Sequence, residues 1–413
     1  MLVEDSLILK KGLKKETNFI DLIFRVENMK QEIILLILLF FLLSFAKSSD
    51  LILKSANSNI NTMGKDGEII SVLSGNVVFL YEDAVIKSQN AKWWKSRGTV
   101  TFTDNVIIQR QAQTLFSDRM DYDKNKKSLT AEGKIDFWDA KEKVKLTGKK
   151  GVYNIDSHLL TIEGNPCFYF FDTLAKDTLK ISSKKMTYND SLKIASVFGD
   201  VLITKGKLFT KSNIAHYYVD SGWVYLRELP NVAYDTDSIR GDSVDVLFVE
   251  KRMKLAKVKG KSVGQYKNYG QTDTSITHLI GDSLCIFFTD SGKTDSMWVI
   301  GNVISRYIPI KKPYLESQAF GKQMTVSFDE KGDVSFVKIW GNAKSIYNLE
   351  EKDGRGINDA SGDTIIVLFT NGKVSKVRLS GSVRGYYAPL PQFVASSLEN
   401  TKTAKKNNLL KEK

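Results

Sequence analysis

The side chains that most often carry chemistry are sparse in this 413-residue sequence. Its three histidines, His158, His216 and His278, lie far apart, and its two cysteines, Cys167 and Cys285, belong to no CxxC or Cys/His cluster. There is also no HExxH, GxSxG or phosphate-loop motif. Histidine-based, zinc-based and phosphate-loop chemistry therefore have no recognisable site, and we predict no enzymatic activity, no metal and no cofactor.

Two further patterns offer chemistry but have structural explanations. Gly-Asp-Ser triplets at 241–243 and 281–283, with a related triplet at 362–364, place an Asp beside a hydroxyl. Because they recur at equivalent positions, we interpret them as turn and strand-entry residues and not as nucleophiles. Four aromatic pairs could stack on sugars or bases, but adjacent strand residues face opposite sides, so one ring of each pair is expected in the core. These pairs are Trp93-Trp94, Phe170-Phe171, Tyr217-Tyr218 and Tyr386-Tyr387.

The elements that position these residues are set by an internal repeat. A phrase of Gly or an equivalent residue, followed by Asn or Asp and then Val in most copies, recurs ten times, with its first position at residues 75, 104, 133, 164, 199, 230, 260, 301, 341 and 381. Apolar residues stand two positions before and two after most of these glycines, which is the period of a strand with one buried face. A second strand-like segment and a turn follow in each repeat. The sequence therefore predicts an all-β, elongated body of about ten stacked repeats with roughly two strands each.

The apolar positions after the glycines are expected to form one interior trough. Stacked repeats folded around an axis would make this trough continuous, and such a trough can accept acyl chains. The candidate lipid-binding residues are Val77, Phe79, Val106, Ile108, Ile135, Phe137, Val201, Ile203, Val232, Val303 and Val383. The three last full repeats are about ten residues longer, and we interpret the extra stretches 266–277, 306–318 and 347–359 as projecting loops.

The chain ends differ from the repeats in composition. Residues 1–46 form a predicted leader, in which 29–46 combine Lys30, an apolar run and the small residues Ser44 and Ala46. This is typical of a cleaved Sec-type signal peptide, and an uncleaved inner-membrane anchor is the alternative. Residues 47–390 form the repeat domain, and 391–413 a basic tail that we predict to be disordered. The formal charge of +13 is distributed, with no basic run interleaved with aromatics, so we expect an anionic partner other than nucleic acid.

The repeat resembles that of the OstA-like, LptA-type family of lipopolysaccharide-transport proteins. The stretch 101–109, which reads TFTDNVIIQ, is followed by Ser117-Asp118 and by Met120 and Tyr122, as in the family phrase. The phrases at 341–347 and 381–387 look like those of the long OstA-like proteins of Bacteroidetes-type bacteria. Across residues 51–390, ten copies in register carry the resemblance.

The resemblance implies an antiparallel β-jellyroll, folded like an open taco, that shields the acyl chains of lipopolysaccharide or a lipid A-like glycolipid. It also implies a periplasmic location and end-to-end contacts with other copies or other jellyroll transport components, as a bridge to the outer membrane. Two alternatives stay open. A closed β-solenoid scaffold or adhesin would have no lumen for lipid. A polysaccharide-active β-helix enzyme is disfavoured because no carboxylate cluster stands out within a repeat.

Overall fold

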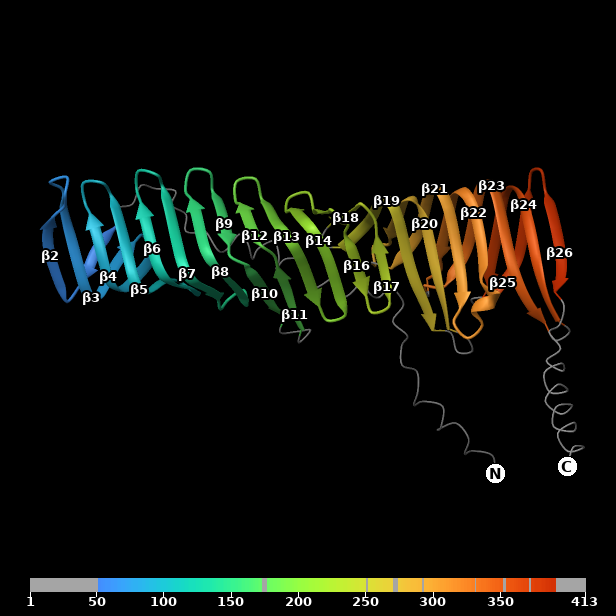
Figure 1. Ribbon diagram of the computed structural model, residues 1–413, viewed down its shortest axis with the longest axis horizontal. Helices are drawn as coiled ribbons and strands as arrows, with labels where there is room; N and C mark the ends of the chain where they lie inside the picture. Colours follow the sequence, from blue (N-terminus) through green and yellow to red (C-terminus); the bar gives the residue numbers. More distant parts are fainter. Residues whose placement is uncertain are drawn as a thin grey trace, which may run out of the picture.

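The computed structural model describes residues 51–390 except 173–176, 250–251, 270–273, 292, 331, 352–353 and 371–372. The predicted leader 1–46, its signal peptide 29–46 and the tail 391–413 lie outside the described residues. The described part consists of strands and one short 3-10 turn, η2 (Pro313–Leu315), which confirms the all-β prediction. It contains no helix long and apolar enough to cross a membrane. The strands lie side by side along an elongated body (Figure 1).

Twenty-six strands form a single sheet in the described residues. The first half comprises β1 (Ile52–Ser55), β2 (Ser58–Met63), β3 (Ile69–Tyr81), β4 (Ala84–Trp94), β5 (Thr99–Arg110), β6 (Gln113–Asp123), β7 (Ser128–Asp139), β8 (Val144–Asn154), β9 (Leu159–Glu163), β10 (Cys167–Asp172), β11 (Asp177–Ser182), β12 (Lys185–Asn189) and β13 (Ile194–Lys205). The second half comprises β14 (Leu208–Tyr218), β15 (Trp223–Arg227), β16 (Asn231–Tyr234), β17 (Asp237–Arg240), β18 (Ser243–Val249), β19 (Arg252–Tyr269), β20 (Thr274–Phe288), β21 (Thr294–Pro309), β22 (Ser317–Phe328), β23 (Val334–Glu351), β24 (Gly354–Thr370), β25 (Lys373–Ser380) and β26 (Arg384–Leu390).

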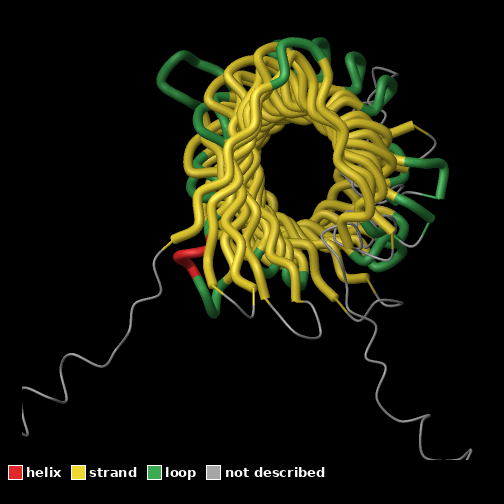
Figure 2. The backbone as a smooth tube through the Cα atoms, turned by 90° about the vertical axis from the view of Figure 1, so that its right-hand side faces the viewer, coloured by secondary structure: helices red, strands yellow, loops and turns green. Residues whose placement is uncertain are grey.

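The long strands form an antiparallel meander. From β3 to β8, each strand pairs with the next along the chain, and the same order holds from β19 to β24. Viewed along the long axis, the strands trace an oval (Figure 2). This arrangement is the predicted antiparallel jellyroll of stacked repeats.

A β-bulge at the repeat phrase bends each repeat's first strand. In β3, Ser74 pairs with Asn90 and Val77 pairs with Ser88, so that two residues of β3 oppose one residue of β4. The two extra residues, Gly75 and Asn76, have φ values of 75° and 50°. This conformation is open to Gly and tolerated by Asn, and a bulge of this kind bends the strand. The Gly-Asn phrase therefore forms a corner, which recurs along the body.

The row of corners divides the sheet into two arms. Arm A lies between the corners and the turns that join β3 to β4, β5 to β6 and their equivalents in later repeats. Arm B lies between the corners and the turns that join β4 to β5, β6 to β7 and their equivalents. Neighbouring long strands pair in both arms, but each matched pair of residues in the described part of the chain lies within one arm. Strand β3 pairs with β1 in arm A and with β2 in arm B. The two rows of turns form the rims of the arms.

Prolines split two of the repeats. Pro166 separates β9 from β10 and Pro230 separates β15 from β16, because proline has no N–H to donate at the corner. In the second case the positive φ values fall on Glu228 and Leu229, before the proline. In the next repeat, Ser262 occupies a buried position after the corner, and its hydroxyl donates a hydrogen bond to the Gly281 carbonyl at 2.7 Å.

The interpretation of 266–277, 306–318 and 347–359 as projecting loops was wrong. Most of these residues extend the arm A strands, since β19 and β20 pair as far as Tyr269 and Thr274. Strands β23 and β24 likewise pair as far as Glu351 and Gly354. In 306–318 the strands are joined by a short connection that contains η2. Polar composition misled the prediction, because one face of an antiparallel strand can be solvated.

The buried core lies between the two arms and forms two clusters. The first runs from Leu51 to Ala195, and the second from Val201 to Ile365. Both contain alternate residues of successive strands, so the core follows the length of the body.

Candidate functional site

The glycine of the repeat phrase is required by a neighbouring side chain as well as by its own backbone. A Cβ added at Gly260, Gly301 or Gly381 would overlap the carboxylate of Asp242, Asp282 or Asp363, respectively. These are the aspartates of the Gly-Asp-Ser and Gly-Asp-Thr triplets. The earlier Asp118 lies against Gly133 in the same way, and its Oδ2 accepts a hydrogen bond from the Lys134 N–H at 2.9 Å. The triplets therefore build the corners, which is a structural role. Only 241–243 stands at a strand entry, as predicted, because 281–283 and 362–364 lie within β20 and β24.

The predicted trough residues share the interior face of arm A. Eight of them are buried, namely Val77, Phe79, Val106, Ile108, Ile135, Phe137, Val201 and Val303. Ile203 and Val232 are half-buried and pack against the core clusters. Val383 differs, because it lies between β25 and β26 and is 55% exposed. Arm B supplies the opposite wall with buried residues such as Leu73, Phe102 and Ile162, which were not predicted as lipid-binding residues. Each stands two residues before the first position of its repeat phrase, a spacing that is visible in the sequence.

Side chains of the two arms meet across the trough. The Phe79 ring of arm A lies edge-on to Trp93 and Phe102 of arm B, with ring centroids 5.4 and 5.2 Å apart. Near the rims, Tyr81 of arm A and Tyr122 of arm B have ring centroids 5.8 Å apart. The arms are thus held together in this region by apolar and aromatic contacts, because the strand pairings do not cross from one arm to the other.

Two cavities that open into the interior of the described residues are small. A cavity of about 50 Å³ lies between the arms, and a second of about 10 Å³ lies next to it. Residues from both arms line the larger cavity, including Phe137, Leu146 and Phe168 from arm A and Ile162, Met186 and Ala195 from arm B. An engineered cavity of about 150 Å³ holds one benzene ring. These cavities are therefore too small for an acyl chain unless the side chains or the arms move.

Polar groups gather where the trough meets the rims. Burial raises the pKa of the Tyr153 and Tyr217 hydroxyls to about 12, and burial together with the Asp190 carboxylate raises the pKa of Tyr188 as well. Asp237, on the arm A side, is buried, and its Oδ1 accepts a hydrogen bond from the Lys267 N–H at 2.8 Å. Burial raises the pKa of Asp237 to about 6. The inward side of the rims is thus polar and carries hydroxyls that are neutral at pH 7.

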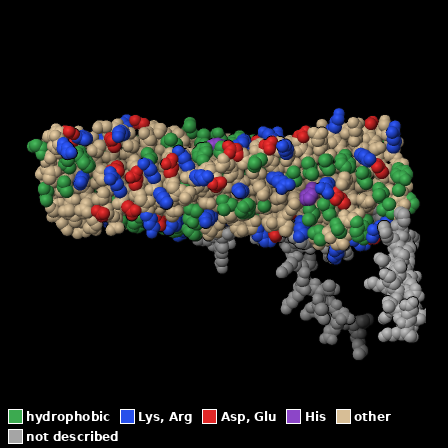
Figure 3. Space-filling model, in the orientation of Figure 1, with side chains coloured by type: hydrophobic (Ala, Val, Ile, Leu, Met, Phe, Trp, Pro, Cys, Tyr) green, Lys and Arg blue, Asp and Glu red, His purple; other side chains and the backbone are tan. Residues whose placement is uncertain are grey.

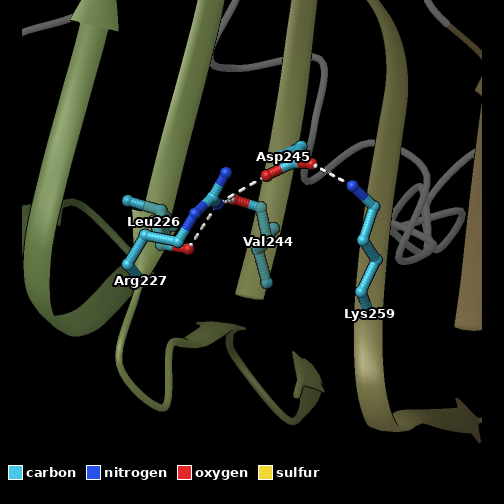
Figure 4. Close-up of polar contacts among 5 residues, drawn as sticks. All are labelled: Leu226, Arg227, Val244, Asp245 and Lys259. Carbon is cyan, nitrogen blue, oxygen red and sulfur yellow. Dashed lines mark hydrogen bonds and ion pairs between the residues drawn. The ribbon is translucent and has the colours of Figure 1, made fainter. Parts of the chain in front are cut away.

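A buried charge on the outer face of arm B has a structural role. Asp245 accepts a hydrogen bond from Arg227 Nη1 at 2.5 Å and from Lys259 Nζ at 3.0 Å (Figure 4). The same Arg227 nitrogen also donates to the carbonyls of Leu226 and Val244 (Figure 4). Because the carboxylate is paired on both sides, the cluster ties β15, β18 and β19 together.

The described residues contain no group of three or more His, Cys, Asp or Glu side chains placed to hold a metal ion. Cys167 and Cys285 are free thiols, on arm A and arm B respectively. Acidic and basic side chains are interspersed over the visible outer face (Figure 3). The apolar trough between the arms is therefore the longest continuous interior feature of the described residues.

Comparison with known proteins agrees with the predicted resemblance. Residues 85–179, from within β4 to within β11, match the family model described as LptA/(LptD N-terminal domain) LPS transport protein. A similar solved structure is that of LptH from Pseudomonas aeruginosa, described as the LptA homologous periplasmic component of the conserved lipopolysaccharide transport device. That match has 14% sequence identity and a TM-score of 0.24, and it covers 26% of this chain and 77% of the other. No curated protein matches the sequence. The predicted OstA-like, LptA-type resemblance is confirmed by the family match.

Proposed function

Taking the LptA-type domain of residues 85–179 as the premise, we propose that this protein is a non-enzymatic carrier of lipopolysaccharide or a related lipid A-like glycolipid. Acyl chains would lie in the trough between the arms, and the sugar and phosphate groups would lie at the rims. The observation that carries the proposal is the interior itself, whose apolar residues continue through both core clusters from Leu51 to Ile365.

Loading the trough requires the arms to part. The arms meet in the trough through side chains such as Phe79 and Trp93, while backbone pairing lies within each arm. An acyl chain that enters between them replaces apolar contacts with other apolar contacts, so the hydrophobic burial lost on opening is largely recovered. The corner bulges are the natural hinges of this movement, since they join the arms.

A closed β scaffold is the second candidate function. The small size of the two cavities favours it, because a permanently packed core needs no ligand. The two candidates differ in whether the trough admits lipid at all.

The test uses a substitution that fills the larger cavity. Ala195 is buried and lines this cavity, so Ala195→Phe places a ring where an acyl chain would begin to enter. We expect lipopolysaccharide to co-purify with the wild-type protein, as detected by mass spectrometry of extracted lipid, and to be reduced several-fold by Ala195→Phe. Ala140→Phe, at an exposed turn, is the matched control and should leave the lipid content unchanged. Absence of lipid from the wild-type protein, together with no binding of added lipopolysaccharide, would support the closed scaffold.

The location and partners belong to the same proposal. The predicted signal peptide 29–46 would export the chain to the periplasm. At one end of the described sheet, β1 and β2 pair only with β3, and at the other end β25 and β26 pair only with β24. Each end therefore offers strand edges to which another jellyroll could add, so we propose end-to-end contacts with other copies or other transport components.

A further inference from the structure

One tyrosine recurs at the same place in each of the last repeats. Tyr266, Tyr307, Tyr347 and Tyr387 each stand six residues after the glycine of the repeat phrase, at Gly260, Gly301, Gly341 and Gly381. The residue at this position in the first repeat is Tyr81. Tyr266, Tyr307 and Tyr347 lie on the strands that extend arm A, within the stretches predicted as loops, and Tyr387 lies on β26.

The tyrosine side chains lie on the same face of arm A as the trough residues. Tyr307 pairs across β20 and β21 with Thr277, which in turn pairs with Tyr266. Tyr347 and Tyr387 both pair with Asn358 of β24. Residues four positions before Tyr307 and Tyr347, Val303 and Ala343, are buried in the core. Because side chains at even spacing share a face, the tyrosines continue the trough wall outward.

Exposure of the tyrosines rises toward the C-terminal end. The exposed fraction is 41% for Tyr307, 48% for Tyr347 and 57% for Tyr387. Successive tyrosines are separated by two strands, or roughly 10 Å. They form an open row along the arm A rim and not a packed core.

The residues beside the row are small or polar. Between the core and the tyrosines stand Ser305 and Ser345, where the first repeats have Phe79 and Phe137. Thr277, Ser317 and Asn358 share their face on the intervening strands, as the strand register shows. This wall of arm A therefore changes from apolar in the N-terminal repeats to hydroxyl- and amide-bearing in the last ones. Such a surface suits a polar ligand better than an acyl chain.

Three cations near the row are paired with carboxylates. Arg306 binds Glu316 with two hydrogen bonds of 2.6 and 2.9 Å. Arg355 pairs with Glu350 at 3.3 Å, and Lys344 with Asp359 at 2.9 Å. These charges are balanced locally, so the surface favours an uncharged polar ligand over a bare phosphate. Exposed tyrosine rings beside hydroxyls and amides fit sugars, whose C–H faces pack on rings while their hydroxyls exchange hydrogen bonds.

We propose that Tyr307, Tyr347 and Tyr387 form a saccharide-binding row that holds the sugar part of the glycolipid while its acyl chains lie in the trough. This inference rests on the proposed function for the identity of the ligand. The row itself would bind free oligosaccharide whether or not the trough binds lipid.

The experiment measures affinity by calorimetry for three probes, namely lipopolysaccharide, its lipid A, and the deacylated core oligosaccharide. The full chain is compared with Tyr307→Ala/Tyr347→Ala/Tyr387→Ala, whose positions are exposed, so that the fold should be retained and can be checked by circular dichroism. We expect affinity for the oligosaccharide and for lipopolysaccharide to fall roughly tenfold or more, with affinity for lipid A unchanged. The matched control compares Tyr387→Ala with Tyr386→Ala, a neighbouring residue that is 67% exposed on the opposite face of β26. Only the first should weaken oligosaccharide binding.

Three results would overturn the proposal. The first is that the wild-type chain does not bind the oligosaccharide. The second is that Tyr386→Ala and Tyr387→Ala lower the affinity for the oligosaccharide equally. The third is that the triple variant changes its oligomeric state but still binds the oligosaccharide. The last would mean that a second copy covers the row. Failure of the proposed function looks different, because lipid A would then fail to bind the wild-type chain whatever happens with the oligosaccharide.

Discussion

At the scale of single residues, the corner glycines are constrained twice. Gly301 has a φ of 75°, which is costly for a residue with a Cβ, and its α-carbon faces the Asp282 carboxylate. Gly67 has a similar φ of 74° but no heavy atom within 4 Å of the position of an added Cβ. Comparing the two separates backbone strain from steric overlap.

We expect Gly301→Ala to lower the free energy of unfolding by about 1–3 kcal/mol, and Gly67→Ala to lower it by about 1 kcal/mol through strain alone. Urea unfolding curves measure both. Adding Asp282→Ala to Gly301→Ala should restore part of the loss, since it removes the overlapping carboxylate. A double variant whose loss is the simple sum of the single losses would show that the overlap does not matter.

Asp237 makes stability depend on pH. Its pKa is raised from the ordinary value of 3.8 to about 6 by burial, so the folded state holds the proton more tightly than the unfolded state. Stability from this group is therefore highest below pH 4, declines as the pH rises to about 6 and is constant at higher pH.

Asp237→Asn should thus gain stability relative to the wild type as the pH rises from 4 to 7.5, by up to ~3 kcal/mol at 1.36 kcal/mol per pKa unit. The amide oxygen can still accept the hydrogen bond from the Lys267 N–H. The measurement is the difference in urea midpoint between the two proteins at each pH. A difference that stays constant with pH would show that Asp237 titrates normally.

At the scale of the elements, the arms are expected to move as units about the corners. Linking Tyr81→Cys to Tyr122→Cys with a cleavable bismaleimide, in a Cys167→Ser/Cys285→Ser background, would tie the rims where their rings now meet. We expect the linked protein to load lipopolysaccharide at least several-fold more slowly, and cleavage of the linker to restore the rate. Equal loading rates before and after cleavage would argue that lipid does not enter between the rims at this point.

The sequence predicted the arms well in the first repeats and less well in the last. Alternation around the glycines identified residues such as Phe79, Ile108 and Phe137 as one interior face, because a period of two leaves little freedom in a strand. It did not reveal that the stretches near Tyr307 and Tyr347 are strands, since Lys, Asp, Asn and Gly have low β propensity and the pairing partner supplies the order. Nor did it reveal the polar wall of arm A, because the face on which Ser305 and Ser345 lie depends on the register of the paired strands.

At the scale of the whole molecule, the buried core forms two clusters that meet at β13. One ends at Ala195 and the other begins at Val201, and Ile203 packs against both, so two packed regions lie in series. The number of repeats and the elongated, all-β shape followed from the sequence, because the repeats cannot bury a face alone. The division could not be predicted, since it depends on contacts across the trough.

Unfolding is therefore expected to show two transitions. Phe102→Ala should destabilise only the first region, lowering its free energy of unfolding by about 3–5 kcal/mol. Leu284→Ala should destabilise only the second region, by a somewhat smaller amount. Both side chains are fully buried. Urea titration followed by circular dichroism would resolve the transitions. A single transition that both variants shift equally would show that the body unfolds as one unit.

The most direct measurement of the central claim compares neighbouring residues of β13. A photoactivatable amino acid is placed at Ile203, which packs against the core, and separately at Leu202, the adjacent residue on the opposite face. After illumination in the presence of lipopolysaccharide, we expect lipid adducts at Ile203 and essentially none at Leu202. Adducts of equal yield at both positions, or adducts at Leu202 alone, would contradict the claim that acyl chains lie between the arms.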